Sequence, residues 1–142
     1  MKIINYPCLA VKNKTVEAVI IALLTCWILT VPVCAETIRI TAAANHRTVE
    51  MKVGDNLELT LAGNPTTGYV WEKVAGDNTI LSLQGDYKYI PARSALVGSG
   101  GKFVFTFLGA APGKTKLRLI YSRPFEKDTA PIKTFAVKVI VK

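Results

Sequence analysis

Few residues of this 142-residue chain could take part in acid–base or nucleophilic catalysis. His46 is the only histidine, and it lies between Asn45 and Arg47 in a segment typical of a turn. A hydrolytic triad needs a base beside its nucleophile and an acid that orients the base. No serine and carboxylate stand at a spacing that would complete a triad with His46. We therefore expect His46 to be a solvated turn residue, while a hydrolase that uses His46 as its base stays open as an alternative.

The carboxylates are no better placed for chemistry. They stand singly on expected turns or outward strand positions: Asp55, Glu58, Glu72, Asp77 and Asp86. Glycoside hydrolysis needs a pair of carboxylates brought together, and metal binding needs clustered Cys, His, Asp or Glu ligands. The chain also lacks a P-loop and the glycine pattern of dinucleotide-binding folds. The sequence thus predicts a protein that is not an enzyme and that holds no cofactor and no metal.

The first 35 residues are typical of a secretory signal peptide. A basic start with Lys2, Lys12 and Lys14 precedes an apolar run over Ala18–Val31, and Val33-Cys34-Ala35 provides a small-residue cleavage site. The apolar run is shorter than the roughly 20 residues of a spanning helix. We therefore expect cleavage and export, to the periplasm or the medium. An uncleaved N-terminal membrane anchor is the alternative.

The cysteine positions agree with this division into residues 1–35 and 36–142. All three cysteines fall in the first segment, so the expected mature domain has no thiol. An exported domain without disulfide bonds depends on its hydrophobic core for stability. It also cannot be a thiol enzyme or a cysteine-ligated metal site. We expect one domain, and nothing in the sequence indicates more than a monomer.

The expected mature domain is basic, with 15 Lys or Arg residues against 9 Asp or Glu residues. Along the sequence these basic residues are scattered singly over strand-like segments. Such scattering is a poor match to a nucleic-acid-binding stripe, so we expect no nucleic-acid partner. We favour a solvated basic surface that serves solubility. The functional alternative is attraction to an acidic partner, which would raise the association rate more than the affinity.

The residues after Ala35 alternate between apolar and polar types, as in half-buried strands. Examples are Leu57-Glu58-Leu59-Thr60-Leu61, Phe103-Val104-Phe105-Thr106-Phe107, and the last strand with Phe135, Val137, Val139 and Val141. Turn signals recur between these segments, and no helical period is evident. The pattern predicts an all-β, immunoglobulin-like sandwich of roughly seven to nine antiparallel strands. Trp71 is then expected to be a core tryptophan.

One turn, Asn64-Pro65-Thr66-Thr67-Gly68-Tyr69, is chemically unusual. Pro65 fixes its own φ and disfavours the α region for Asn64, while Gly68 permits a positive φ. The two threonines add small, branched polar groups that suit a surface better than a core. The segment is therefore predicted to be a stiff, exposed loop between two strands.

Two further loops accompany it. One runs over Pro91–Gly101 and ends in Gly98-Ser99-Gly100-Gly101, and the other opens with Arg123-Pro124-Phe125. In the predicted sandwich the three loops occupy alternate connections, so they emerge at the same end. Taken singly, the glycine run could be a plain turn, and Phe125 could be tucked into the edge of the core. Together on one rim, the three loops favour binding, because cations and aromatic residues are enriched in binding hot spots.

The ordered segments Asn64-Pro65-Thr66-Thr67-Gly68-Tyr69, Leu96-Val97-Gly98-Ser99-Gly100-Gly101 and Arg123-Pro124-Phe125 resemble the signature loops of the chagasin family. This family inhibits papain-like cysteine proteases. The resemblance covers essentially all of the expected mature domain. It implies that all residues of the three segments contact the protease, with Asn64–Gly68 over its catalytic cysteine. The implied inhibition is reversible, competitive and non-covalent.

The third segment departs from the family pattern, in which a tryptophan usually follows Arg-Pro. Phe125 stands in that place, so this loop loses contact area and the indole donor. Val97 is a lesser variation. An immunoglobulin-like adhesion or ligand-binding module of the cell envelope is the alternative function, since the same loops could bind a surface that is not a protease.

Overall fold

The computed structural model describes residues 34–93, 98–126 and 128–142. Within these residues the chain forms nine β-strands and two short 3-10 helices, with no α-helix. The strands are β1 (Thr37–Thr41), β2 (Thr48–Met51), β3 (Asn56–Gly63), β4 (Val70–Ala75), β5 (Leu81–Leu83), β6 (Lys88–Pro91), β7 (Gly101–Gly109), β8 (Gly113–Ser122) and β9 (Lys133–Val141). The 3-10 helices are η1 (Ala42–Ala44) and η2 (Pro65–Thr67).

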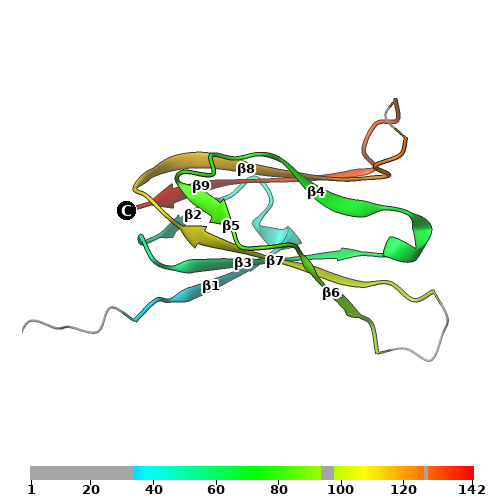
Figure 1. The fold of residues 1–142 in the computed structure, drawn as a ribbon, viewed down its shortest axis with the longest axis horizontal. Helices are drawn as coiled ribbons and strands as arrows, with labels where there is room; N and C mark the ends of the chain where they lie inside the picture. The colour runs from blue at the N-terminus through cyan, green and yellow to red at the C-terminus, as the bar shows by residue number, and fades with distance from the viewer. Residues whose placement is uncertain (1–33, 94–97, 127) are drawn as a thin grey trace, which may run out of the picture. The chain divides into compact units, whose positions relative to one another are not determined.

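The strands form two facing sheets (Figure 1). The first sheet has the order β1-β3-β7-β5, and β6 also pairs with β7. The second sheet has the order β2-β9-β8-β4. This arrangement confirms the predicted sandwich, in which each sheet turns one apolar face toward the other.

Two strand pairs differ from the expectation of antiparallel pairing throughout. β1 runs parallel to β3, and β2 runs parallel to β9, whereas the other ladders are antiparallel. The parallel pairing of β1 with β3 follows from the path of the chain near its start. After β1 the chain passes through η1 into the second sheet as β2, then returns to the first sheet as β3. Parallel neighbours need such a crossover connection, and here β2 and its flanking turns supply it.

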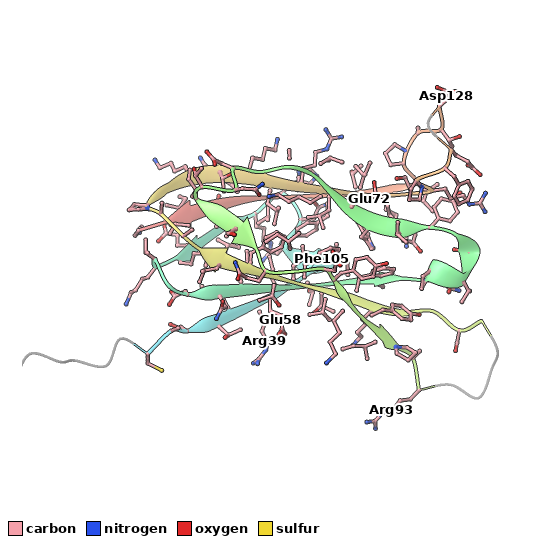
Figure 2. All side chains as sticks on the ribbon, in the orientation of Figure 1. Arg39, Glu58, Glu72, Arg93, Phe105 and Asp128 are labelled. Carbon is pink, nitrogen blue, oxygen red and sulfur yellow. The ribbon has the colours of Figure 1, made fainter. Side chains whose placement is uncertain are left out.

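The core lies between the sheets and is built from alternating apolar residues. Three phenylalanines of β7 face inward, and Figure 2 shows one of them, Phe105, between the two layers. Three leucines of β3 meet them in register: Leu57, Leu59 and Leu61 lie opposite Phe107, Phe105 and Phe103. Trp71 is 5% exposed, and its indole N–H donates to the carbonyl of Ala62 at 3.1 Å. The prediction of a core tryptophan is therefore confirmed.

The proposed signal peptide lies outside the described residues except for Cys34 and Ala35. Its cleavage and the division into residues 1–35 and 36–142 remain predictions. In the part of the chain that the structure describes, no helix is long and apolar enough to cross a membrane.

Candidate functional site

The three unusual loops meet at one end of the sandwich, on the right in Figure 1. The first loop, Asn64–Tyr69, joins β3 to β4; the second joins β6 to β7; and the third begins with Arg123 after β8. The second loop is described from Gly98 onward, so Leu96 and Val97 lie outside the described residues. The hydrogen bonds and ring contacts below connect the first loop to each of the others.

The first loop is held in shape by its own hydrogen bonds. Pro65–Thr67 form the 3-10 helix η2, and the side chain of Asn64 caps its start by accepting from the backbone N–H of Thr66 at 3.1 Å. The hydroxyl of Thr66 donates to the same oxygen at 2.7 Å, and the hydroxyl of Thr67 donates to the carbonyl of Asn64 at 2.6 Å. Gly68 ends the turn with φ 79°. The predicted turn is present as a 3-10 helical turn closed by its own hydrogen bonds, while its stiffness stays a prediction.

The second loop is bound to the first through Asn64. Its side-chain amide donates to the carbonyl of Gly98 at 2.8 Å. The backbones also approach closely, because a Cβ atom on Gly100 would lie 3.0 Å from the carbonyl oxygen of Gly63. Asn64 therefore uses its oxygen to close the first loop and its nitrogen to hold the second. The glycine run is part of this rim, and it is more than a plain turn.

The third loop is bound to the first through Arg123. Its Nε donates to the carbonyl of Thr67 at 3.2 Å, and its guanidinium lies 4.5 Å from the centre of the Tyr69 ring. A second guanidinium nitrogen bonds the carboxylate of Glu126 at 2.8 Å. This hydrogen bond, which Arg123 donates to the Glu126 carboxylate, raises the pKa of Arg123 above its usual value. Arg123 is thus a fixed cation that positions the first loop.

Phe125 is presented to solvent beside the first loop. Its side chain is 70% exposed, so the alternative of a residue tucked into the core edge is wrong. A Cβ atom on Gly68 would lie 3.1 Å from Cζ of Phe125, which shows how near the ring comes to the first loop. Thr66, Thr67 and Pro124 are also exposed. The rim therefore combines an aromatic ring, hydroxyl groups and proline on a surface free to meet a partner.

Tyr121 supports the first loop from below, a contact that the sequence did not reveal. It is buried near the end of β8, yet its hydroxyl accepts from the backbone N–H of Asn64 at 2.7 Å. Its ring packs against Tyr69 and Trp71, with centroids 5.5 and 5.1 Å away. In the sequence Tyr121 is only one more apolar position of an alternating strand. Its place two residues before Arg123 was the one available signal.

The described part of the rim offers binding groups: carbonyls, hydroxyls, the Arg123 guanidinium and the exposed ring of Phe125. His46 lies elsewhere, in an exposed turn before β2, where its backbone N–H donates to the carbonyl of Ala136 at 2.6 Å. Among the described residues, no three His, Cys, Asp or Glu side chains gather closely enough to hold a metal ion. The arrangement at the rim suits recognition of a protein surface.

Comparison with known proteins gives matching results in sequence and structure. Residues 50–139 match the model of the chagasin family peptidase inhibitor I42. Amoebiasin-1 of Entamoeba histolytica is 34% identical over 100 residues, which cover 69% of this chain and 93% of that protein. Chagasin of Trypanosoma cruzi is 31% identical over 104 residues, which cover 70% of this chain and 93% of that protein.

A solved structure has the same fold. The crystal structure of the cysteine protease inhibitor EhICP2 from Entamoeba histolytica superimposes with a TM-score of 0.68 and 28% sequence identity. The match covers 76% of this chain and 97% of that one. The matched family segment contains the first loop, the second loop and the Arg123-Pro124-Phe125 segment.

Proposed function

This chain belongs to the chagasin family of peptidase inhibitors, and on that premise we propose that it is an exported, reversible, competitive inhibitor of papain-like cysteine proteases. It is an inhibitor and not an enzyme, as its family is. The proposed contacts are the first loop, the second loop over Leu96–Gly101, and Arg123-Pro124-Phe125. The observation that carries the proposal is the linkage of these loops into one rim through Asn64 and Arg123.

The shape of the first loop supports inhibition without cleavage. A protease attacks a carbonyl that is presented in near-attack geometry by an extended chain. Here Pro65–Thr67 form a 3-10 helical turn. The Thr67 hydroxyl donates to the carbonyl of Asn64, and the Thr67 carbonyl accepts from Arg123. The loop would fill the cleft without presenting an extended segment to the catalytic thiolate. Residues 36–142 contain no cysteine, so a chain cleaved after Ala35 could form no disulfide with the enzyme.

The linked loops also favour tight binding. The described parts of the loops are already linked by hydrogen bonds through Asn64 and Arg123, so we expect little of their conformational entropy to be lost on association. An interface of roughly 1,600 Å² is expected for a protease–inhibitor pair of this kind. We propose that the domain acts as a monomer in the periplasm or the medium. It would be tied to a membrane only if the N-terminal segment stays uncleaved.

The test is a substitution at the tip of the first loop. Thr67→Arg should abolish inhibition of papain by the full chain, because the exposed Thr67 would carry a bulky charge into the cleft. The sandwich should stay folded, as measured by circular dichroism, although the variant also loses the hydrogen bond that the Thr67 hydroxyl donates to the Asn64 carbonyl. Inhibition is read by titrating the chain into papain at nanomolar enzyme concentration.

Thr37→Arg is the matched control. Thr37 is also exposed, but it lies at the start of β1, opposite Asn56 and so at the other end of the first sheet. This variant should inhibit like the parent chain. If Thr67→Arg inhibits papain as well as the parent does, the first loop does not enter the cleft. If the parent itself fails at micromolar concentration, the adhesion or ligand-binding alternative gains support.

A further inference from the structure

A second surface feature lies on the outer side of the β2-β9-β8-β4 sheet. It is a hollow of about 460 Å³, which we call the basic hollow. Its lining residues are His46, Arg47, Thr48, Lys114, Thr115, Lys116, Ala136, Val137 and Lys138. None of these described lining residues is acidic, and four of them are Lys or Arg.

The basic residues gather here because of strand register. Lys114 and Lys116 are two positions apart on β8, so their side chains leave the same face of the sheet. Lys138 of β9 lies directly opposite Lys116, and Thr48 of β2 lies opposite Lys138. Lys116 and Lys138 therefore form a row of two cations across β8 and β9, with Lys114 beside it on β8 and the polar Thr48 beside it on β2. Basic residues that are scattered along the sequence are thus brought together in space on this face.

This row is electrostatically unfavourable by itself. Like charges directly opposite on neighbouring strands destabilise a sheet. The described ion pairs are Arg39–Glu58, Arg123–Glu126 and Lys142–Glu50, and none includes a residue that lines the basic hollow. Glu50 is the acidic residue of β2, but it lies opposite Ile140 and is already bonded by Lys142. Positive charge is thus concentrated here without a partner within the described chain.

We propose that the basic hollow binds an acidic polysaccharide that carries sulfate groups. Sulfates would neutralise Lys114, Lys116 and Lys138, while the exposed side chains of His46 and Thr48 could hydrogen-bond sugar hydroxyls. Neighbouring strands lie about 4.8 Å apart, and alternate residues of one strand are about 6.7 Å apart. These are the approximate backbone spacings from Lys116 to Lys138 and from Lys116 to Lys114. A flexible polysaccharide with closely spaced sulfate groups can match these distances.

The lining residues favour a glycan over other polyanions. Proteins that bind single-stranded nucleic acid use aromatic side chains for stacking, and no Phe, Tyr or Trp lines the basic hollow. Surfaces that insert into membranes bring exposed apolar groups with their cations. The exposed large apolar residues of the described chain, among them Val74, Ile90 and Phe125, lie outside the lining set.

The basic hollow is well separated from the rim. Lys116 lies near the start of β8, whereas Arg123 directly follows its end. Seven residues of strand span about 23 Å. A glycan on the outer face would therefore leave the three loops free. The inhibitor would be retained on an acidic extracellular matrix while its rim stays available to a protease.

The test measures binding of the full chain to a size-defined heparin oligosaccharide at several salt concentrations. The double variant Lys116→Gln/Lys138→Gln should weaken binding about tenfold or more near physiological salt. The slope of log affinity against log salt should fall by about one for each lysine removed. The double variant should fold, because it removes two like charges that lie directly opposite each other on neighbouring strands. Melting temperatures verify this.

The matched control is Arg39→Gln/Lys88→Gln, which removes the same charge from exposed positions of the other sheet. It should change heparin affinity by less than about twofold, on the expectation that screened charges act locally. Equal weakening by both double variants would overturn the proposal, since net charge alone would then explain binding. Tighter binding to duplex DNA of equal charge, or to vesicles containing phosphatidylglycerol, would also overturn it. Neither the heparin affinity nor its salt dependence relies on protease inhibition, so this proposal can fail while the proposed function stands.

Discussion

The hydroxyl of Tyr121 shows how a buried side chain can shape an exposed loop. It accepts from the backbone N–H of Asn64 at 2.7 Å and lies 3.3 Å from the Asn64 carbonyl, to which it can donate. Asn64 in turn caps η2 and bonds Gly98. One phenol group therefore fixes the residue on which two of the loops depend.

Replacing Tyr121 with Phe should loosen the first loop while keeping the core packed. The ring contacts with Tyr69 and Trp71 would survive, but the N–H of Asn64 would lose its acceptor. Such a loss costs about 1–3 kcal/mol when the group stays buried. We expect a lower free energy of unfolding by about this amount and weaker papain inhibition. Chemical denaturation and inhibition constants measure the two effects; unchanged inhibition would show that the hydroxyl does not position the loop.

The exposed ring of Phe125 gives a second prediction at the residue scale. Phe125→Trp should tighten papain inhibition, because a larger ring offers more apolar area to the cleft. About 40 Å² of extra burial corresponds to about 1 kcal/mol, or roughly fivefold in the inhibition constant. The melting temperature should not change, since the side chain is 70% exposed.

Phe125→Ala provides the opposing variant and should weaken inhibition at equal stability. If neither substitution alters the inhibition constant, the third loop does not reach the enzyme.

At the scale of elements, the glycines of the second loop permit close packing as well as turning. A Cβ atom on Gly101 would lie 2.3 Å from the carbonyl oxygen of Ile90, in the neighbouring strand β6. Gly101 also pairs with Gly63 at the end of β3 and with Pro91 of β6. Three strands thus converge at a residue without a side chain, just where the second loop enters β7.

Gly101→Ala should therefore separate β6 from β7 and displace the second loop. Overpacking of this kind costs about 1–3 kcal/mol, and the main obstacle here is backbone, which cannot rotate away. Thermal melting should show reduced stability, and papain inhibition should weaken.

Gly85→Ala is the control for Gly101→Ala, because Gly85 has φ 68° but no atom within 4 Å of the added Cβ. It should cost only the strain of a positive φ, about 1 kcal/mol, and leave inhibition unchanged. If Gly101→Ala is no worse than this control, the close approach at Gly101 does not constrain the sandwich.

The strands and the first loop could be predicted from the sequence, because their signals are local. Alternation of the leucines in β3 and of the phenylalanines in β7 is a local signal, and it predicted the strands and their inward faces. The composition of Asn64–Gly68 predicted a stiff loop, because the backbone limits of Pro65 and Gly68 are local as well. Export and the individual protease contacts of the loop residues stay predictions.

Features that depend on distant partners were not visible in the sequence. The parallel pairing of β1 with β3 arises from the excursion of β2 into the other sheet, which no short segment encodes. The bond from Tyr121 to Asn64 joins residues 57 positions apart. The row of Lys116 and Lys138 appears only when β8 and β9 are placed in register.

At the scale of the whole molecule, one carboxylate links the two sheets at the end of the sandwich away from the rim. Asp55 is buried in the turn before β3, and it accepts from the backbone N–H of Glu36 at 3.0 Å and of Lys52 at 2.8 Å. Glu36 leads into β1 of the first sheet, while Lys52 follows β2 of the second. The backbone carbonyl of Asp55 also accepts from Gly109 at the end of β7. Both sheets therefore depend on this residue.

Because of these contacts, the free energy of unfolding should vary with pH in the acid range. The N–H donors of Lys52 and then Glu36 lower the pKa of Asp55 below its ordinary value of 3.8. The folded state therefore binds this proton less readily than the unfolded state does. The resulting stabilisation is fully present above the unfolded pKa and is lost as pH falls through the lowered folded pKa. We expect the free energy of unfolding to fall between about pH 5 and pH 2.

Asp55→Asn should be less stable than the parent at pH 7, since an amide can accept from one N–H but would turn its own NH₂ toward the other. The variant should also lose part of the acid dependence, because the titrating group is gone. Urea denaturation at a series of pH values from 7 to 2 measures both effects. Asp86→Asn removes an exposed carboxylate between β5 and β6 and serves as the control. If Asp55→Asn keeps the parent's full acid dependence, protonation of other carboxylates, and not release of this link between the sheets, governs acid unfolding.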